Sequence, residues 1–418
     1  MKKWLTVLLI VAVVLTIGTA GLAKSEVVIR VSGYGGIDVD VFGQLMDRVS
    51  ATLKAQGIKV AYEPVADDYV RTLMNSLSSG TGPDLFYLQQ ETAEGFIASN
   101  KIEPLNNYLA ASKISPKKDF IPSLISAYSK GGKIYGIAKD FNTLVLYYNK
   151  DLFDLAKVPY PDENDTWDTL ESKLAKVTNK DKQIYGMAVQ PEVQRMGAFA
   201  VATGWNFFDK KGRTNLLDPN FKRAFTWYTG LVKKGIGVVP SDVGQGWGGG
   251  AFTKEIAATC IEGAWLINSI NNDAPNMRYG TTLLPKDSKT GKRGTLIYSV
   301  AWAMNKDGKH KKEAFKVLEQ LTSAESQQFI LEHGMALPSR AALINSPYFK
   351  QDTAAAKANY TVLLAASKDN AFPFVTGVWG NDWANQINEP LRAVLTNSSS
   401  ADDALQEAQK RIEELMKR

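Results

Sequence analysis

The sequence predicts an α/β protein of two lobes, and three features of the chain support this fold class. Strand-like and helix-like segments alternate along the chain, which is the pattern of α/β folds. A chain of 418 residues exceeds the roughly 100 to 200 residues of one domain, so we expect two folded units. No proline- or glycine-rich linker divides the chain, so we expect strands or short turns to cross between the lobes.

The first 23 residues have the features of a secretory signal peptide. Lys2 and Lys3 form a positive start, residues 5–17 are apolar apart from threonine, and small residues precede an expected cleavage after Ala23. The apolar run is shorter than the ~20 residues of a membrane-spanning helix, although an uncleaved anchor is the alternative. A lipid anchor would need a cysteine close behind this run, and the single cysteine is Cys260. We therefore expect a protein that is free in the periplasm.

The first α/β unit follows this leader. Apolar periodicity and glycines that end helices predict five elements. They are a strand at 27–32, a helix at 42–53, a strand at 58–62, a helix at 69–80 and a strand at 84–88. This alternation predicts a parallel sheet, whose ligands bind beyond the carboxyl ends of the strands. The loops at those ends, 33–36 and 89–91, are glycine-rich or polar, although ordinary loop chemistry also explains them.

A second α/β unit begins after residue 151. Thr166 predicts the start of a helix, residues 184–189 predict a strand, and Asp218 followed by proline predicts another helix that ends at Gly235. Apolar residues at helical spacing from 405 to 415 predict a terminal amphipathic helix.

Composition excludes several classes of function. One cysteine excludes disulfides and cysteine-rich metal sites, and His310 and His333 have no metal-ligand spacing. The net charge of +6 falls to +4 without Lys2 and Lys3, which is too little for a nucleic-acid surface. Residues 244–249, GQGWGG, fit a dinucleotide motif, but no strand precedes them, so a loop before a short helix is the better interpretation. We therefore expect no cofactor, no metal and no nucleic-acid partner.

Acidic and aromatic residues remain as candidates for a site. Asp140, Glu262, Asp382 and Glu389 could supply a carboxylate pair for glycoside hydrolysis, but carboxylates that bind a ligand or face solvent are the preferred interpretation. Flat indoles beside Asn, Asp and Gln fit both the apolar faces and the hydroxyls of sugar rings, and a buried structural role is the alternative for each tryptophan. Six of the nine tryptophans lie in or beside segments rich in Gly, Asn and Asp: Trp205, Trp247, Trp265, Trp302, Trp379 and Trp383.

Several short motifs occur in a fixed order along the mature chain. They are GTGPDL at 80–85, GKIYGI at 132–137, LYYNKDLF at 146–153, TWDTL at 166–170, the segment 252–265 and GMALPSR at 334–340. The ordered set resembles the extracellular solute-binding proteins of ABC transporters, in the sugar-binding family that includes maltose-binding protein. The segment 255–265 departs from the Gly-Lys and Gly-Pro-Trp that are common in that family.

The resemblance implies a two-lobed periplasmic-binding-protein fold with a ligand cleft between the lobes that closes on sugar. By position, the first lobe is implied to hold 24–139 and 306–340, and the second lobe 144–298 and 349–418. The implied crossings are near 138–143, 299–305 and 341–348.

The resemblance also implies where the ligand binds. The implied positions are Tyr34 to Asp38, Gln89, Gln90, Glu91, Asp140 to Asn142, Trp205, Trp265 and the segment from Trp379 through Asp382 to Trp383. Trp247 and Trp302 join this set because of the tryptophan pattern. The expected function is that of a monomeric, non-enzymatic receptor that delivers a carbohydrate to the permease subunits of an ABC importer. An exported carbohydrate-active enzyme and a receptor for another solute are the alternatives.

Overall fold

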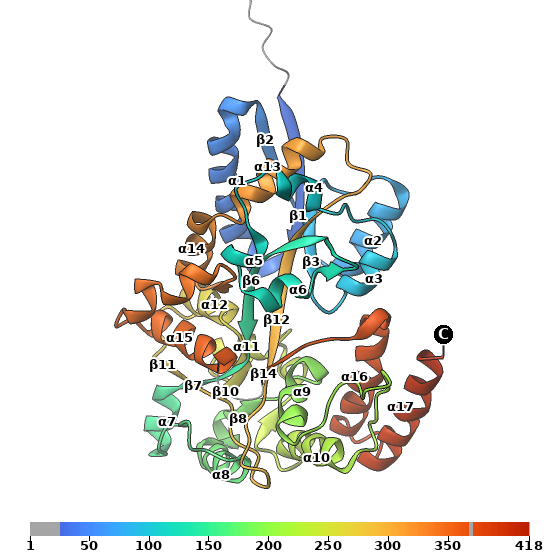
Figure 1. Ribbon diagram of the computed structural model, residues 1–418. Helices are drawn as coiled ribbons and strands as arrows, with labels where there is room; N and C mark the ends of the chain where they lie inside the picture. The colour runs from blue at the N-terminus through green and yellow to red at the C-terminus, as the bar shows by residue number, and fades with distance from the viewer. Residues whose placement is uncertain (1–25, 368–370, 418) are drawn as a thin grey trace, which may run out of the picture.

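The computed structural model describes residues 26–367 and 371–417, and these residues form two lobes (Figure 1). Each lobe is built on one main β-sheet with helices around it. The expected signal peptide at 1–23 lies outside the described residues. Within the described part of the chain, no helix is long and apolar enough to cross a membrane.

The sheet of the first lobe has seven strands in the order β13-β6-β12-β3-β1-β2, with β14 paired to β12. As predicted, β1 is parallel to both β2 and β3. The expectation of a parallel sheet is wrong for β12, which runs antiparallel to β3 and to β6 because the chain re-enters this lobe in the opposite direction. The strands are β1 (Val27–Tyr34), β2 (Ile58–Val65), β3 (Leu85–Gln89), β6 (Gly136–Thr143), β12 (Thr295–Met304), β13 (Leu337–Pro338) and β14 (Ala371–Pro373).

The sheet of the second lobe has five strands in the order β11-β7-β10-β8-β9 and is also mixed. β8 is parallel to β9 and β10, whereas β7 is antiparallel to β10 and β11. The strands are β7 (Val145–Asn149), β8 (Tyr185–Ala188), β9 (Gly237–Val238), β10 (Ala257–Glu262) and β11 (Tyr279–Thr282). A short hairpin of β4 (Ser129–Lys130) and β5 (Lys133–Ile134) completes the strands.

Two strands, β6 and β12, lie at the junction of the lobes, and we call them the connecting strands. β6 passes into β7 of the other sheet after one residue, Leu144. The hydroxyl of Thr295 on β12 accepts a hydrogen bond from the Leu144 nitrogen (3.0 Å) and donates one to its carbonyl (2.8 Å). The junction is therefore made of paired strands and not of a flexible tether. The lobe boundaries implied by the resemblance remain predictions.

Sequence signals predict the starts of several helices. Thr166 and Thr169 form a reciprocal capping box at α8 (Trp167–Val177). Asp218 caps α10 (Pro219–Lys233) by accepting from the Asn220 nitrogen (2.8 Å), and Ser400 caps α17 (Ala401–Leu415). The helices beside the first sheet are α1 (Val39–Leu53), α2 (Tyr69–Ser79), α3 (Ala93–Ala98), α4 (Asn106–Ala110), α5 (Pro116–Asp119), α6 (Pro122–Ser126), α13 (Lys311–Leu321) and α14 (Ala324–Glu332).

The remaining helices surround the second sheet and the junction. α15 packs against β6, β7 and β11, so it covers the point where the two sheets meet. The bounds are α7 (Lys150–Ala156), α8 (Trp167–Val177), α9 (Val193–Ala202), α10 (Pro219–Lys233), α11 (Gly248–Thr253), α12 (Trp265–Asp273), α15 (Ala354–Ser367), α16 (Asn381–Leu395) and α17 (Ala401–Leu415).

Candidate functional site

A cavity of about 400 Å³ lies between the lobes beside the connecting strands, and we call it the cleft cavity. The first lobe contributes residues that follow β1 and β3, because both parallel strands end at this edge of the sheet. Seven of the predicted ligand residues line it together: Tyr34, Asp38, Gln89, Glu91, Asp140, Asn142 and Trp265. The cavity therefore brings together residues that are more than 200 positions apart in the chain.

A buried lysine pairs with one of these carboxylates. Lys139 is 3% exposed, and its ammonium forms an ion pair with the Asp140 carboxylate. The same ammonium lies 4.5 Å and 4.6 Å from the ring centroids of Phe42 and Tyr87. The aromatic faces and the carboxylate replace the water that a buried ammonium loses.

Asp38 and Glu91 are carboxylates of the cleft cavity without an ion pair among the described residues. Burial raises the pKa of Asp38 to about 6, and Lys139 opposes this rise; the Tyr87 hydroxyl donates to Asp38 at 3.4 Å. Burial also raises the pKa of Glu91 to about 7. Hydroxyl or amine donors of a ligand would complete the hydrogen bonding of both groups.

A second buried ion pair holds Trp265 on the opposite wall. The Glu262 carboxylate is 1% exposed and accepts from the Arg195 guanidinium (2.6 Å) and from the Trp265 indole Nε1 (2.9 Å). Arg195 Nε also donates to the Ile261 carbonyl (3.0 Å), and the rings of Tyr298 and Trp265 form a T-shaped pair with centroids 6.2 Å apart. The indole is thus fixed at its nitrogen and at its ring before any ligand arrives.

Asn142 lines the cleft cavity but its side chain is already engaged. Its Oδ1 accepts from the Ala264 nitrogen (2.9 Å), and its Nδ2 donates to the Met335 carbonyl (3.3 Å). The first contact holds the residue before Trp265, and the second reaches the first lobe. The geometry favours a role in positioning the wall over a direct bond to the ligand.

Three predicted tryptophans lie in the cores of the lobes and not in the cleft cavity. Trp302 is fully buried, with its ring centroid 4.6 Å from that of Tyr87. Trp383 is also fully buried and donates from Nε1 to the Thr214 hydroxyl (2.9 Å), and Trp205 donates to the Asn215 carbonyl (2.8 Å). Trp302 lies within β12, Trp383 within the first turn of α16, and Trp205 after the turn at 203–204, and all three indoles are buried, which corrects their assignment to the site.

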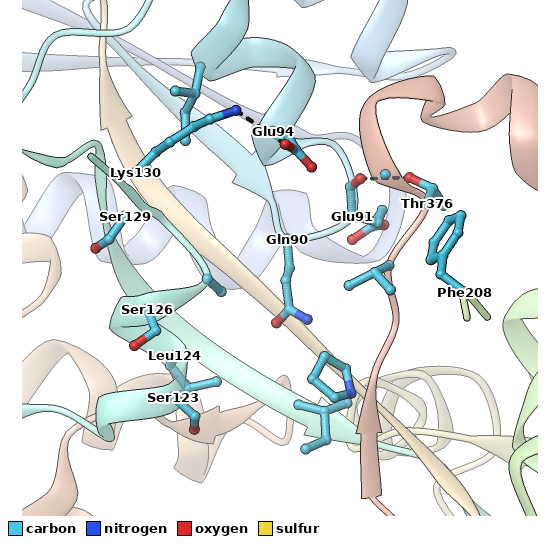
Figure 2. A pocket seen from close by; sticks show the side chains of 16 residues that line it. Gln90, Glu91, Glu94, Ser123, Leu124, Ser126, Ser129, Lys130, Phe208 and Thr376 are labelled. Carbon is cyan, nitrogen blue, oxygen red and sulfur yellow. Dashed lines mark hydrogen bonds and ion pairs between the residues drawn. The ribbon is translucent and has the colours of Figure 1, made fainter. Parts of the chain in front are cut away.

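Four other predicted residues also lie outside the cleft cavity, namely Gln90, Trp247, Trp379 and Asp382. Trp247 is half-buried before α11 and covers Gly249, where an added Cβ atom would lie 2.3 Å from the Trp247 ring. Trp379 stacks on Phe208 with centroids 6.0 Å apart, and Asp382 is exposed at the start of α16. Gln90 points to the other face of the sheet, into a second cavity (Figure 2).

Sequence reasoning missed Lys139, Arg195 and Tyr298, which all line the cleft cavity. A signal existed for two of them. Lys139 is a charged residue within an eight-residue strand that is buried throughout, and Arg195 lies in a helix that is otherwise mostly apolar. Charged residues are almost never fully buried unless they are paired, so each position indicated a partner.

The carboxylates considered for hydrolysis do not form a pair. Asp140 is bound to Lys139, Glu262 to Arg195, and Glu389 to Arg411 at 3.1 Å on the surface of α16. Across residues 26–367 and 371–417, no cluster of histidine, cysteine, aspartate and glutamate side chains could hold a metal ion.

Known proteins share the sequence pattern and the fold. Residues 47–357 match the family model described as a bacterial extracellular solute-binding protein. A binding protein of Brucella abortus (strain 2308) is 25% identical over 430 residues, covering 100% of this chain and 99% of the relative. A maltotriose-binding protein of Pyrococcus abyssi (strain GE5 / Orsay) is 24% identical over 326 residues, covering 75% of this chain and 67% of the relative. An ABC substrate-binding protein from Listeria monocytogenes, solved in complex with cycloalternan, has a TM-score of 0.84 at 22% identity and covers 93% of this chain and 98% of its own.

Proposed function

The chain belongs to the bacterial extracellular solute-binding protein family, and we propose that it binds a carbohydrate in the cleft cavity and delivers it to an ABC importer. The observation that carries the proposal is the fixed indole of Trp265 on one wall, opposite the carboxylates of Asp38 and Glu91. An indole face fits the apolar face of a sugar ring, and carboxylates accept hydrogen bonds from its hydroxyls.

The charges of the cleft favour a neutral ligand. Lys139 is paired with Asp140, and Arg195 is paired with Glu262, so both cations of the lining have a carboxylate partner. An anionic ligand would have to compete with these carboxylates and would meet Asp38 and Glu91 as well. A neutral oligosaccharide meets no such repulsion. The names of the relatives support this class, since one is a maltotriose-binding protein.

The proposal has further parts. We infer that residues 1–23 direct export to the periplasm, that the protein acts as a monomer, and that permease subunits of the importer receive the loaded form. We also infer that the bound sugar is returned unchanged, because the acidic residues considered for hydrolysis are held in ion pairs or exposed away from the cavity.

A melting-temperature screen tests the proposal. Maltotriose, other oligosaccharides, a polyol and a sugar phosphate are each added to the purified protein, and binding to the folded state raises the melting temperature. We expect one or more neutral saccharides to raise it and the sugar phosphate to have no effect. Chromatography of the recovered sugar should show no new species, and products would contradict the receptor function.

A further inference from the structure

A second cavity of about 630 Å³ lies between the lobes, and we call it the rear cavity. Ile297 on β12 lines the rear cavity, whereas its neighbour Tyr298 lines the cleft cavity. In the same way, Gln90 lines the rear cavity and Gln89 lines the cleft cavity. Successive residues of an extended chain point to opposite faces. The two cavities therefore lie on opposite faces of the connecting strand β12 and meet at Glu91, which lines both.

One wall of the rear cavity carries hydrogen-bonding groups that face the cavity. Gln90 is 9% exposed, and its side-chain amide has no hydrogen-bond partner among residues 26–367 and 371–417. Figure 2 shows this amide within the cavity, where the hydroxyls of Ser123 and Ser126 on α6 also line the wall. The residue is nine-tenths buried, and its side-chain amide is left to bond to a ligand or to water in the cavity.

The facing wall is apolar. Phe208, Pro373 at the end of β14 and Val375 line it, and the ring of Phe208 is held by stacking on Trp379. Among the described residues that line the cavity, the charged ones besides Glu91 are Lys130 and Glu94, which pair with each other at 3.1 Å (Figure 2). The charges of Lys130 and Glu94 cancel each other. An amide and hydroxyls opposite an apolar wall match a neutral molecule that has both hydroxyls and C–H faces.

We propose that the rear cavity is a second binding site, distinct from the cleft cavity, for a small neutral polyhydroxylated molecule such as a polyol or disaccharide. Gln90 binds its hydroxyls, and Phe208 and Val375 cover its C–H face. Thr376 of the second lobe donates to the Glu91 carbonyl of the first lobe (2.6 Å) at the rim shared by both cavities. Because both sites lie between the same lobes, occupancy of the rear cavity changes the affinity of the cleft cavity, and the reverse holds equally.

Neighbouring glutamines provide a matched pair of variants for the test. Gln89→Leu changes the cleft cavity, and Gln90→Leu makes the same chemical change one residue along, in the rear cavity. Both are introduced into a Trp265→Ala protein, whose cleft is weakened, and D-mannitol, maltose and trehalose are titrated by calorimetry. We expect residual saturable binding of at least one probe, weakened at least about tenfold by Gln90→Leu and unchanged by Gln89→Leu.

Any other result contradicts the proposal that the rear cavity is a second binding site. Absence of residual binding of all three probes contradicts it, and so does residual binding that Gln89→Leu removes and Gln90→Leu leaves intact. The test is separate from that of the cleft, because Gln90-dependent binding would support the rear site even if no sugar bound the cleft. The melting temperatures of both variants show whether each is folded.

Discussion

Trp265 and Trp383 have similar surroundings in the sequence but different positions in the structure. Each follows a short polar, glycine-containing segment, and both were predicted to bind the ligand. The Trp265 indole donates to Glu262, a buried carboxylate at the cleft, and its ring stays half-buried beside the cavity. The Trp383 indole donates to the Thr214 hydroxyl within the core, and its ring is fully buried.

The two indoles differ in the partner of Nε1, and each partner suits the place where the indole lies. A neutral hydroxyl can satisfy Nε1 inside a packed core, next to Phe207 and Phe208. A carboxylate needs a cation as well, and Arg195 must reach it from α9. The Arg195–Glu262 pair therefore keeps the Trp265 side chain at the edge of the cavity.

The largest expected effect is on stability at Trp383. Trp383→Ala removes a fully buried side chain and should lower the free energy of unfolding by about 3 to 5 kcal/mol. Sugar affinity of the folded fraction should stay at the wild-type value. Urea denaturation and calorimetry measure the two quantities, and a large loss of affinity without destabilisation would place Trp383 in the site.

Loss of Glu262 should lower both the free energy of unfolding and the affinity for sugar. Glu262→Leu leaves Arg195 without its carboxylate partner and should cost about 3 to 5 kcal/mol of stability, besides weakening sugar binding through the freed indole. The double variant with Arg195→Met should recover part of the stability, because no unpaired charge remains. If the double variant is as unstable as the single one, charge pairing is not the cause.

Trp265→Ala is expected to act on affinity instead of stability. Lost stacking and apolar contact of about 1 to 3 kcal/mol correspond to roughly tenfold to hundredfold weaker sugar binding. The melting temperature without ligand should change much less than in Trp383→Ala, because the Trp265 ring is only half-buried. Equal melting temperatures for the two variants would remove the contrast between them.

Titration of the Asp38 carboxyl should make the free energy of unfolding depend on pH. Its pKa is raised to about 6 in the folded protein, so the folded state holds a proton that the unfolded state has released between about pH 4 and 6. Stability should therefore fall as pH rises through this window, by on the order of 3 kcal/mol for the full shift. Asp38→Asn should reduce this fall in denaturation curves measured from pH 4 to 7. An unchanged pH dependence would mean that Asp38 is not the group responsible.

Local signals predicted much of the fold. The capping box at Thr166 and Thr169 and the Asp218-Pro219 start of α10 depend only on neighbouring residues, so the sequence contains them directly. The antiparallel pairing of β6 with β12 joins residues about 160 positions apart. Nothing in the local pattern of either segment gives that direction, and the first sheet was therefore predicted as parallel and is mixed.

The site could be predicted only in part, because local patterns place some of its residues and distant partners determine the others. Tyr34 and Gln89 lie at the carboxyl ends of parallel strands, where the strand geometry and the family resemblance both predicted ligand positions. Lys139 and Arg195 were missed because their role depends on partners that the fold supplies from other elements. The buried tryptophans were misplaced because the composition of a loop does not give the direction of an indole.

Paired calorimetric titrations of wild type and Trp265→Ala with a panel of neutral oligosaccharides test the central claim most directly. The claim is that the cleft cavity binds sugar against the indole that Glu262 holds. We predict saturable binding of at least one oligosaccharide to the wild type and roughly tenfold to hundredfold weaker binding to a folded Trp265→Ala protein. Equal affinities in the two proteins, or no binding to the wild type, would contradict it.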